Sequence, residues 1–233
     1  MSEDTIYSTQ AWPTNAAMIA DVHRLGYLKD TDVILDPTYG KGAWWRVWAP
    51  GDGRRDPMTS MPNPGTGWVE GMTQDLKTWD SERQEMRTWD FKDMWYADET
   101  FDAVAFDPPY VSVGGRSTSG IKEMHAAYGM DGTPLSPVET QADMNAGLAE
   151  CYRVVKRGGI VLIKCQDYVS SGKLWCGTLH TANYAEMLGF EIVDRLEHLS
   201  GPRPQPDGRR QVHARRNYST LFVLRRRKRN HGK

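Results

Sequence analysis

The sequence predicts one α/β domain over residues 1–233, built on an open, twisted, mixed sheet of seven strands. Two observations lead to this prediction. Short apolar and β-branched runs alternate with segments of helical periodicity, which is typical of a parallel sheet covered by helices. Two further strand-like runs, FEIVDRLEHL and YSTLFVLR, are separated by about twenty polar residues, so we expect the last strand to be antiparallel to its neighbour.

The first half of the chain is expected to contain one helix and four strands. Thr14 is a candidate N-cap for a helix over about residues 14–26, with apolar residues at helical spacing behind it. DVILD, WVEGMT, MRTW and DAVAF read as strands, and the Pro- and Gly-rich span 49–67 reads as a surface excursion. An acid lies at or near the end of each strand: Asp36, Asp75 (or Glu70), Asp90 and Asp107.

The second half begins with residues 111–140, a stretch longer than a compact domain needs for a connection. We therefore expect a mobile loop over the substrate there. QADMNAGLAECYRVVKR and TANYAEMLG read as helices, with Gly189 capping the second, and GGIVLIKC between them reads as a buried strand. Residues 225–233 form a basic tail.

Bulk composition is that of a globular protein. Hydrophobic residues make up 39% of the chain and charged residues 25%. No apolar run approaches the roughly 20 residues that a bilayer span requires, and the polar N-terminus MSEDTIYSTQ does not resemble a signal peptide. We expect a cytoplasmic protein without a membrane partner. His and Cys residues lack the spacing of metal sites, so we expect no metal.

Charge is distributed unevenly along the chain. Residues 195–233 contain 12 Lys and Arg against 2 Asp and Glu, whereas the remaining residues contain 17 against 28. The segment GRRQVHARRNYS places cations beside ring side chains, and such a patch attracts phosphate backbones. Nucleic acid is the expected partner, and a polar hairpin connection is the alternative. The candidate contact residues are His213, Arg215, Arg216 and Asn217, with Arg116 from the long loop.

The turn DPTYGKG, residues 36–42, is the first candidate binding site. Its glycines allow the backbone to pass close to a ligand and turn into a helix, and Asp36 can bind an ammonium group or a sugar hydroxyl. Such turns occur in many nucleotide-binding domains. In open α/β sheets, ligands lie beyond the carboxyl ends of the strands. The acids after the next two strands are therefore candidates for binding ribose hydroxyls and an adenine amino group, although any one acid is more often a turn residue or a helix cap.

DPPY, residues 107–110, is the most specific motif. It ends the strand-like run DAVAF with an acid and two prolines, and prolines do not continue a sheet ladder. Together with DPTYGKG and VVKRGGIVLIKCQD, it resembles the S-adenosylmethionine-dependent amino-methyltransferases, which methylate adenine N6 or cytosine N4 in DNA and sometimes base amines in RNA. HARRNYS is similar to a segment of bacterial and phage DNA methylases of this kind. The resemblance covers most of the chain. It implies a Rossmann-like class I methyltransferase fold that uses S-adenosylmethionine and releases S-adenosylhomocysteine.

The resemblance also implies roles for the site residues. The carboxylate of Asp107 and the carbonyl of Pro108 would accept the N–H bonds of the target amine, Pro109 would keep the turn rigid, and Tyr110 would stack on a base extruded from the duplex. The loop after the first strand, the acids at the strand ends and the N-terminal segment would hold the cofactor. The residues concerned are Asp36, Thr38, Tyr39, Gly40, Gly42, Asp75, Asp90 and Thr14.

Adenine N6 in DNA is the expected target, because Asp in the first motif position is commoner among the adenine enzymes of the family. Cytosine N4 in DNA and a base amine in structured RNA are the alternatives. From another class, a basic nucleic-acid-binding module could retain the fold without catalysis. Near the site, Lys164 and Asp167 either face the ligand or pair with each other, and Trp44 and Trp45 are interpreted as packing residues.

Overall fold

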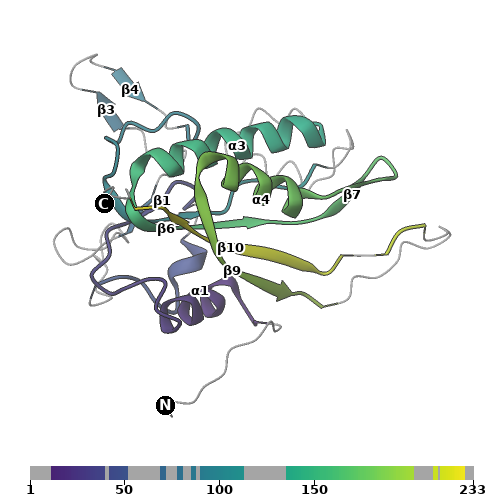
Figure 1. The fold of residues 1–233 in the computed structure, drawn as a ribbon, viewed down its shortest axis with the longest axis horizontal. Helices are drawn as coiled ribbons and strands as arrows, with labels where there is room; N and C mark the ends of the chain where they lie inside the picture. The colour runs from purple at the N-terminus through teal and green to yellow at the C-terminus, as the bar shows by residue number, and fades with distance from the viewer. Residues whose placement is uncertain are drawn as a thin grey trace, which may run out of the picture.

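The computed structural model describes residues 12–39, 42–51, 90–112, 135–201, 212–214 and 216–228, and the backbone of three short strands between 69 and 87. A mixed six-stranded sheet forms the centre of the molecule (Figure 1). In spatial order its strands are β2 (Val69–Gly71), β1 (Ile34–Asp36), β5 (Phe101–Phe106), β6 (Val155–Cys165), β10 (Tyr218–Arg226) and β9 (Phe190–Leu199).

The first four strands of the sheet run parallel to one another. The last strand in the chain, β10, lies between β6 and β9 and is antiparallel to both. The predicted mixed sheet with an antiparallel last strand is therefore confirmed. Because β1 and β5 are parallel neighbours, the turns that follow them leave the sheet at the same edge.

The prediction of seven strands is wrong for the part of the chain that the structure describes. The expected third strand, MRTW, corresponds to β4 (Glu85–Arg87), which pairs with β3 (Thr78–Asp80) in a separate antiparallel hairpin. The sequence of such a short run is compatible both with pairing in the central sheet and with pairing in a local hairpin. A partner a few residues away costs less loop-closure entropy than a distant sheet edge, which favours the hairpin.

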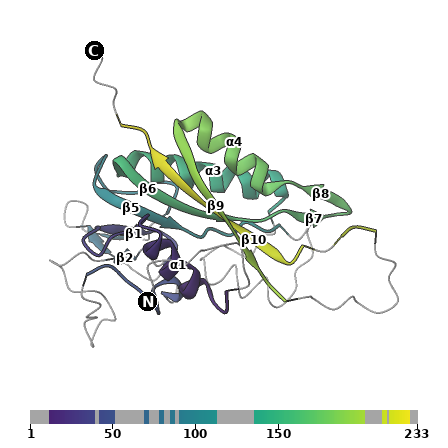
Figure 2. The ribbon, with the colours of Figure 1, turned by 60° about the horizontal axis from the view of Figure 1, so that its bottom comes forward.

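Helices cover both faces of the sheet, as Figure 2 shows. The helix α1 (Asn15–Arg24) and the short 3₁₀ helix η1 (Ala43–Trp45) pack on one face, and α3 (Pro137–Val154) and α4 (Gly177–Leu188) pack on the other. Neighbouring strand residues contribute to opposite cores, so the central strands read as continuous apolar runs. No helix of the described ranges is long and apolar enough to span a bilayer.

Several boundaries differ from those expected. The helix α1 begins after Thr14, whose hydroxyl caps it as predicted, and ends at Arg24. The expected loop 111–140 is shorter at its end, because α3 starts at Pro137 behind a capping box between Ser136 and Glu139. Ser, Pro and Glu at this spacing are a helix-start signal that the sequence already contained.

Other expected segments lie partly outside the described residues. Most of the loop, 113–134, and most of the excursion, 52–67, are among them. The basic tail begins later than expected, because β10 continues through Arg226. A hairpin that the sequence did not predict, β7 (Tyr168–Ser170) with β8 (Lys173–Trp175), projects beyond the end of β6 (Figures 1 and 2).

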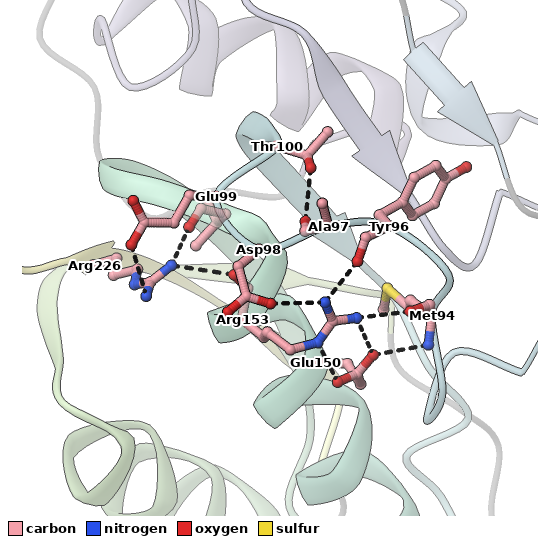
Figure 3. Close-up of polar contacts among 10 residues, drawn as sticks. Met94, Tyr96, Ala97, Asp98, Glu99, Thr100, Glu150, Arg153 and Arg226 are labelled. Carbon is pink, nitrogen blue, oxygen red and sulfur yellow. Dashed lines mark hydrogen bonds and ion pairs between the residues drawn. The ribbon is translucent and has the colours of Figure 1, made fainter.

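Arg153, in the last turn of α3, anchors the segment that leads into β5 (Figure 3). Its guanidinium donates to the main-chain oxygens of Met94 at 2.7 Å and Tyr96 at 2.6 Å, and it pairs with Glu150 at 2.7 Å and Asp98 at 3.0 Å. Glu150 also accepts the main-chain N–H of Met94 at 2.8 Å. This network fixes the amino end of the strand whose carboxyl end carries DPPY.

Candidate active site

The turn DPTYGKG and the motif DPPY meet at the carboxyl edge of the sheet, where a hydrogen-bond chain joins them. The main-chain N–H of Asp107 donates to the Thr38 hydroxyl oxygen at 2.8 Å. The same hydroxyl lies 3.3 Å from Oδ1 of Asp36 and donates to it, and the main-chain N–H of Thr38 donates to that oxygen at 3.0 Å. Thr38 therefore couples the position of one motif to that of the other.

Asp36 is a buried acid at the end of β1. Its Oδ2 accepts the indole N–H of Trp45 at 2.8 Å. Burial raises the pKa of Asp36 to about 7, and the nearby Asp107 adds to this, although hydrogen bonds from Trp45 and Thr38 oppose the rise. The group is thus poised to change its charge near neutral pH, and a cationic neighbour would favour the carboxylate.

Asp107 is half-buried just beyond the end of β5, and Pro108 behind it is buried. The indole N–H of Trp44 donates to Oδ2 of Asp107 at 3.1 Å. Burial raises the pKa of Asp107, whereas the positive charge of Lys164 and the bond from Trp44 lower it. Pro109 and Tyr110 are half-buried, and the Tyr110 ring packs against the apolar core on the α3 face.

Lys164 and Asp167 do not pair with each other. Lys164 is buried at the end of β6, where its ammonium group donates to the side-chain oxygen of Asn15 at 2.9 Å. Asp167 instead accepts the main-chain N–H of Thr178 at 3.0 Å, the Thr178 hydroxyl at 2.7 Å and the Tyr218 hydroxyl at 3.2 Å. Lys164 therefore belongs to the surroundings of Asp107, and Asp167 holds the first turn of α4.

The turn after β1 is closed by Gly42. This glycine has φ 62° and ψ 33°, a left-handed conformation that L side chains rarely adopt, and its N–H donates to the carbonyl of Tyr39 at 2.8 Å. A Cβ at this position would lie 2.5 Å from the Tyr39 hydroxyl oxygen. The glycine therefore allows the backbone to pack directly on the half-buried Tyr39 ring.

Two of the other predicted cofactor residues have local roles. The Thr14 hydroxyl accepts the N–H of Ala17 at 3.1 Å as the cap of α1. Asp90 is exposed, and its side chain accepts the main-chain N–H of Lys92 at 2.9 Å. Asn15, next to Thr14, is linked to the site because its side-chain oxygen accepts a hydrogen bond from Lys164. Four predicted site residues lie outside the described residues: Gly40, Asp75, Arg116 and Arg215.

The described residues of the candidate nucleic-acid segment, 212–214 and 216–217, lie at the same edge of the sheet as Asp107. The start of β10 pairs with the end of β6, with Thr220 opposite Cys165. A ring nitrogen of His213 lies 2.8 Å from the carbonyl of Gly172, between β7 and β8. Arg216 donates to the carbonyl of Ala214 at 2.7 Å, and Asn217 donates to that of Ser200 at 3.0 Å.

Two tryptophans for which the sequence predicted packing alone also belong to the site. Trp44 and Trp45 are indeed buried, as predicted, but each also donates a hydrogen bond to a motif acid. Asn15 gave no signal, since its partner is distant in sequence. Within the described ranges, no group of three or more His, Cys, Asp or Glu residues is arranged to bind a metal ion.

Comparison with known proteins supports the fold. No protein-family model and no curated protein sequence matches this chain. Among solved structures, a chain of the complex between the Haloferax volcanii Trm112 methyltransferase activator and a protein described as a methyltransferase aligns with a TM-score of 0.50. The alignment covers 93% of this chain and 96% of that one at 14% identity. The chain therefore has the class I methyltransferase fold that the sequence predicted.

Two further solved structures are similar at lower scores. A protein described as a methyltransferase from Bacillus halodurans aligns over 90% of this chain and 99% of its own, with 15% identity and a TM-score of 0.48. A protein described as a DNA modification methylase from Thermus thermophilus, solved with S-adenosylmethionine, aligns over 62% of this chain with 15% identity and a TM-score of 0.41. The match covers 56% of that methylase.

Proposed function

We propose that the protein transfers a methyl group from S-adenosylmethionine to the exocyclic amine of an extruded base in DNA, with adenine N6 as the target. The observation that carries the proposal is the chain Asp36–Thr38–Asp107, which joins the two motifs at the carboxyl edge of a methyltransferase fold. Ligands of open α/β sheets bind at this edge.

The residues around β1 suit the cofactor. S-adenosylmethionine carries a sulfonium and an ammonium group, and it supplies an electrophilic methyl group when bound. The buried carboxylate of Asp36 is poorly solvated, so a positive group beside it would stabilise its ionised form. The tight turn at Gly42 packs the main chain on the Tyr39 ring at the same edge. Asp36, Thr38, Tyr39 and Gly42 would hold the cofactor here.

Asp107 and Pro108 supply the chemistry that a base amine needs. The lone pair of such an amine is delocalised into the ring and is a poor nucleophile. Two acceptors, the Asp107 carboxylate and the Pro108 carbonyl, would take its N–H bonds and turn the lone pair toward the methyl group. As the N–C bond forms and the S–C bond breaks, the nitrogen becomes positive. The carboxylate stabilises that charge, and the nitrogen then loses its proton to Asp107 or to water.

The position of residues 212–214 and 216–217 supports a nucleic-acid substrate. These residues lie at the same sheet edge as Asp107 and belong to the basic part of the chain. The contact of His213 with the β7–β8 hairpin would hold this segment beside the site. Arg216, and Arg215 next to it in the sequence, would then contact phosphates and position the duplex, while Tyr110 would stack on the extruded base.

The test is methyl transfer from labelled S-adenosylmethionine to duplex DNA and to structured RNA, followed by nucleoside mass spectrometry. Asp107→Asn is the matched variant, because it keeps the shape of the side chain and removes the charge. We expect N6-methyladenine in DNA with the native protein, and a loss of about 10³-fold in kcat in the variant without loss of cofactor binding.

Other products would redirect the proposal. N4-methylcytosine would change the target base, and label in RNA alone would change the substrate. If the native protein does not bind S-adenosylmethionine in a calorimetric titration, the chain is a nucleic-acid-binding module with a methyltransferase fold. Equal activity of Asp107→Asn would exclude the proposed role of the carboxylate.

A further inference from the structure

Two adjacent tryptophans contact the two motif acids. Trp44 and Trp45 are successive residues of η1, a 3₁₀ turn with about three residues per turn, so their side chains leave it about 120° apart. The indole N–H of Trp45 donates to Asp36 at 2.8 Å, and that of Trp44 donates to Asp107 at 3.1 Å. One short turn thus holds both acids through separate hydrogen bonds.

The chemistry of an indole suits the orientation of a carboxylate. Its N–H is a donor only, so it cannot take a proton from Asp107 or compete with it for the substrate amine. A carboxylate accepts about four hydrogen bonds, and the bond from Trp44 takes one of them. Trp44 is also buried in the core on the α1 face, which fixes the direction of its N–H.

The main chain of Asp107 is held independently of its side chain. Its N–H donates to Thr38, whereas its carboxylate Oδ2 accepts from Trp44. The first bond places the residue in the turn, and the second limits rotation of the carboxylate about its terminal bond. Both partners of Asp107, the acceptor Thr38 and the donor Trp44, belong to the segment that follows β1, so the geometry of the DPPY acid depends on the cofactor turn.

We infer that Trp44 is a positioning residue that holds the Asp107 carboxylate in the orientation needed to accept the substrate amine. This role rests on the proposed methyl transfer. Trp45 has the corresponding role for Asp36 and, through it, for the cofactor. The two roles are separable, because the two indoles contact different acids.

Trp44→Phe tests the inference, with Trp45→Phe as the matched control. For Trp44→Phe we expect an unchanged Kd for S-adenosylmethionine and a decrease in kcat of about 10- to 100-fold, the effect of losing one hydrogen bond to a charged group. The acidic limb of the pH profile of kcat/KM should move to higher pH, since the Trp44 bond lowers the pKa of Asp107. Trp45→Phe should instead weaken cofactor binding and leave that limb in place.

A second variant separates the hydrogen bond from packing. Site-specific replacement of Trp44 by 3-benzothienylalanine keeps the size of the ring system and removes the N–H. It should reproduce both the decrease in kcat and the shifted limb, even if Trp44→Phe proves unstable in thermal unfolding. A readout without substrate is the carboxyl-carbon NMR titration of Asp107, assigned with Asp107→Asn, which should show a higher pKa in both Trp44 variants.

The outcomes distinguish this inference from the proposed function. Suppose that the native protein methylates DNA and that the Trp44 variants have the same kcat, the same acidic limb of the pH profile of kcat/KM and the same Asp107 pKa by NMR. The positioning role of Trp44 is then wrong, and the proposed methyl transfer stands. If the native protein transfers no methyl group to nucleic acid, the proposed function fails and the role of Trp44 fails with it.

Discussion

Carboxylates at the two ends of β5 are held in different ways. At the amino end, Glu150 is hydrogen-bonded to the guanidinium of Arg153, and this bond lowers the pKa of Glu150 (Figure 3). At the carboxyl end, indole groups donate to Asp107 and to Asp36 at the end of the neighbouring β1, and burial raises the pKa of both. A matched cation suits a group that only has to stay in place, whereas neutral donors leave an acid able to respond to a ligand.

The largest expected effect is the pH dependence that Asp36 gives to stability. Its pKa is about 7 in the folded protein, against 3.8 for an ordinary aspartate. The folded state therefore binds this proton more tightly, and the stabilisation present below pH 4 is lost as the pH rises to about 7. The shift corresponds to an upper limit of about 4 kcal/mol. Thermal unfolding of the native protein and of Asp36→Asn between pH 4 and 8 measures it.

The difference in unfolding free energy between the native protein and Asp36→Asn at any one pH also includes altered hydrogen bonds to Trp45 and Thr38. The change of this difference with pH is therefore the relevant quantity. Stability of the native protein relative to Asp36→Asn should decrease as the pH rises from 4 through about 7 and level off as it approaches 8. Parallel curves would show that Asp36 is ionised throughout, and the contrast between the two ends of β5 would disappear.

Removal of the cation at the amino end is expected to have the next largest effect. Arg153→Met leaves Glu150 without its guanidinium partner and frees the carbonyls of Met94 and Tyr96, so we expect a loss of about 2–3 kcal/mol in chemical denaturation. The exposed pair of Lys92 with Asp143 is the matched control, and Lys92→Met should cost less than about 1 kcal/mol. Similar losses in both variants would mean that the network has no special role in holding β5.

Substitution of two glycines is expected to have the smallest effect, and it tests the packing of the cofactor turn that follows β1. Gly42→Ala and Gly26→Ala both place a Cβ on a residue with positive φ, but only the first would overlap a neighbour, the Tyr39 ring. We expect Gly26→Ala to cost about 1 kcal/mol in unfolding free energy and Gly42→Ala about 1 kcal/mol more. Gly42→Ala should also weaken S-adenosylmethionine binding in calorimetry. Equal effects of the two substitutions on both quantities would exclude the close packing on Tyr39.

The sequence was most informative where local chemistry determines structure. The helix cap at Thr14, the strand ahead of DPPY and the antiparallel end of the sheet were all predictable, because apolar periodicity and turn residues act over short distances. The start of α3 at Pro137 was also predictable from its cap, although the expected loop 111–140 includes those residues.

The contacts that complete the site were not predictable in this way. Trp44 and Asp107 are 63 positions apart, and Lys164 and Asn15 are 149 apart. A tryptophan in an apolar run gives no indication of where its N–H will point until the strands are placed. The pairing of β4 with β3 was ambiguous for the same reason, since a short apolar pattern fits more than one partner.

The placement of β10 between β6 and β9 has a consequence for biosynthesis. In the described sheet, β9 reaches the other strands only through β10, which is made after it. While a ribosome is still translating residues 218–226, β9 has no hydrogen-bonding neighbour in that sheet, and β6 lacks its partner on that side. The nascent polypeptide therefore completes the described sheet only after residues 218–226 have been translated.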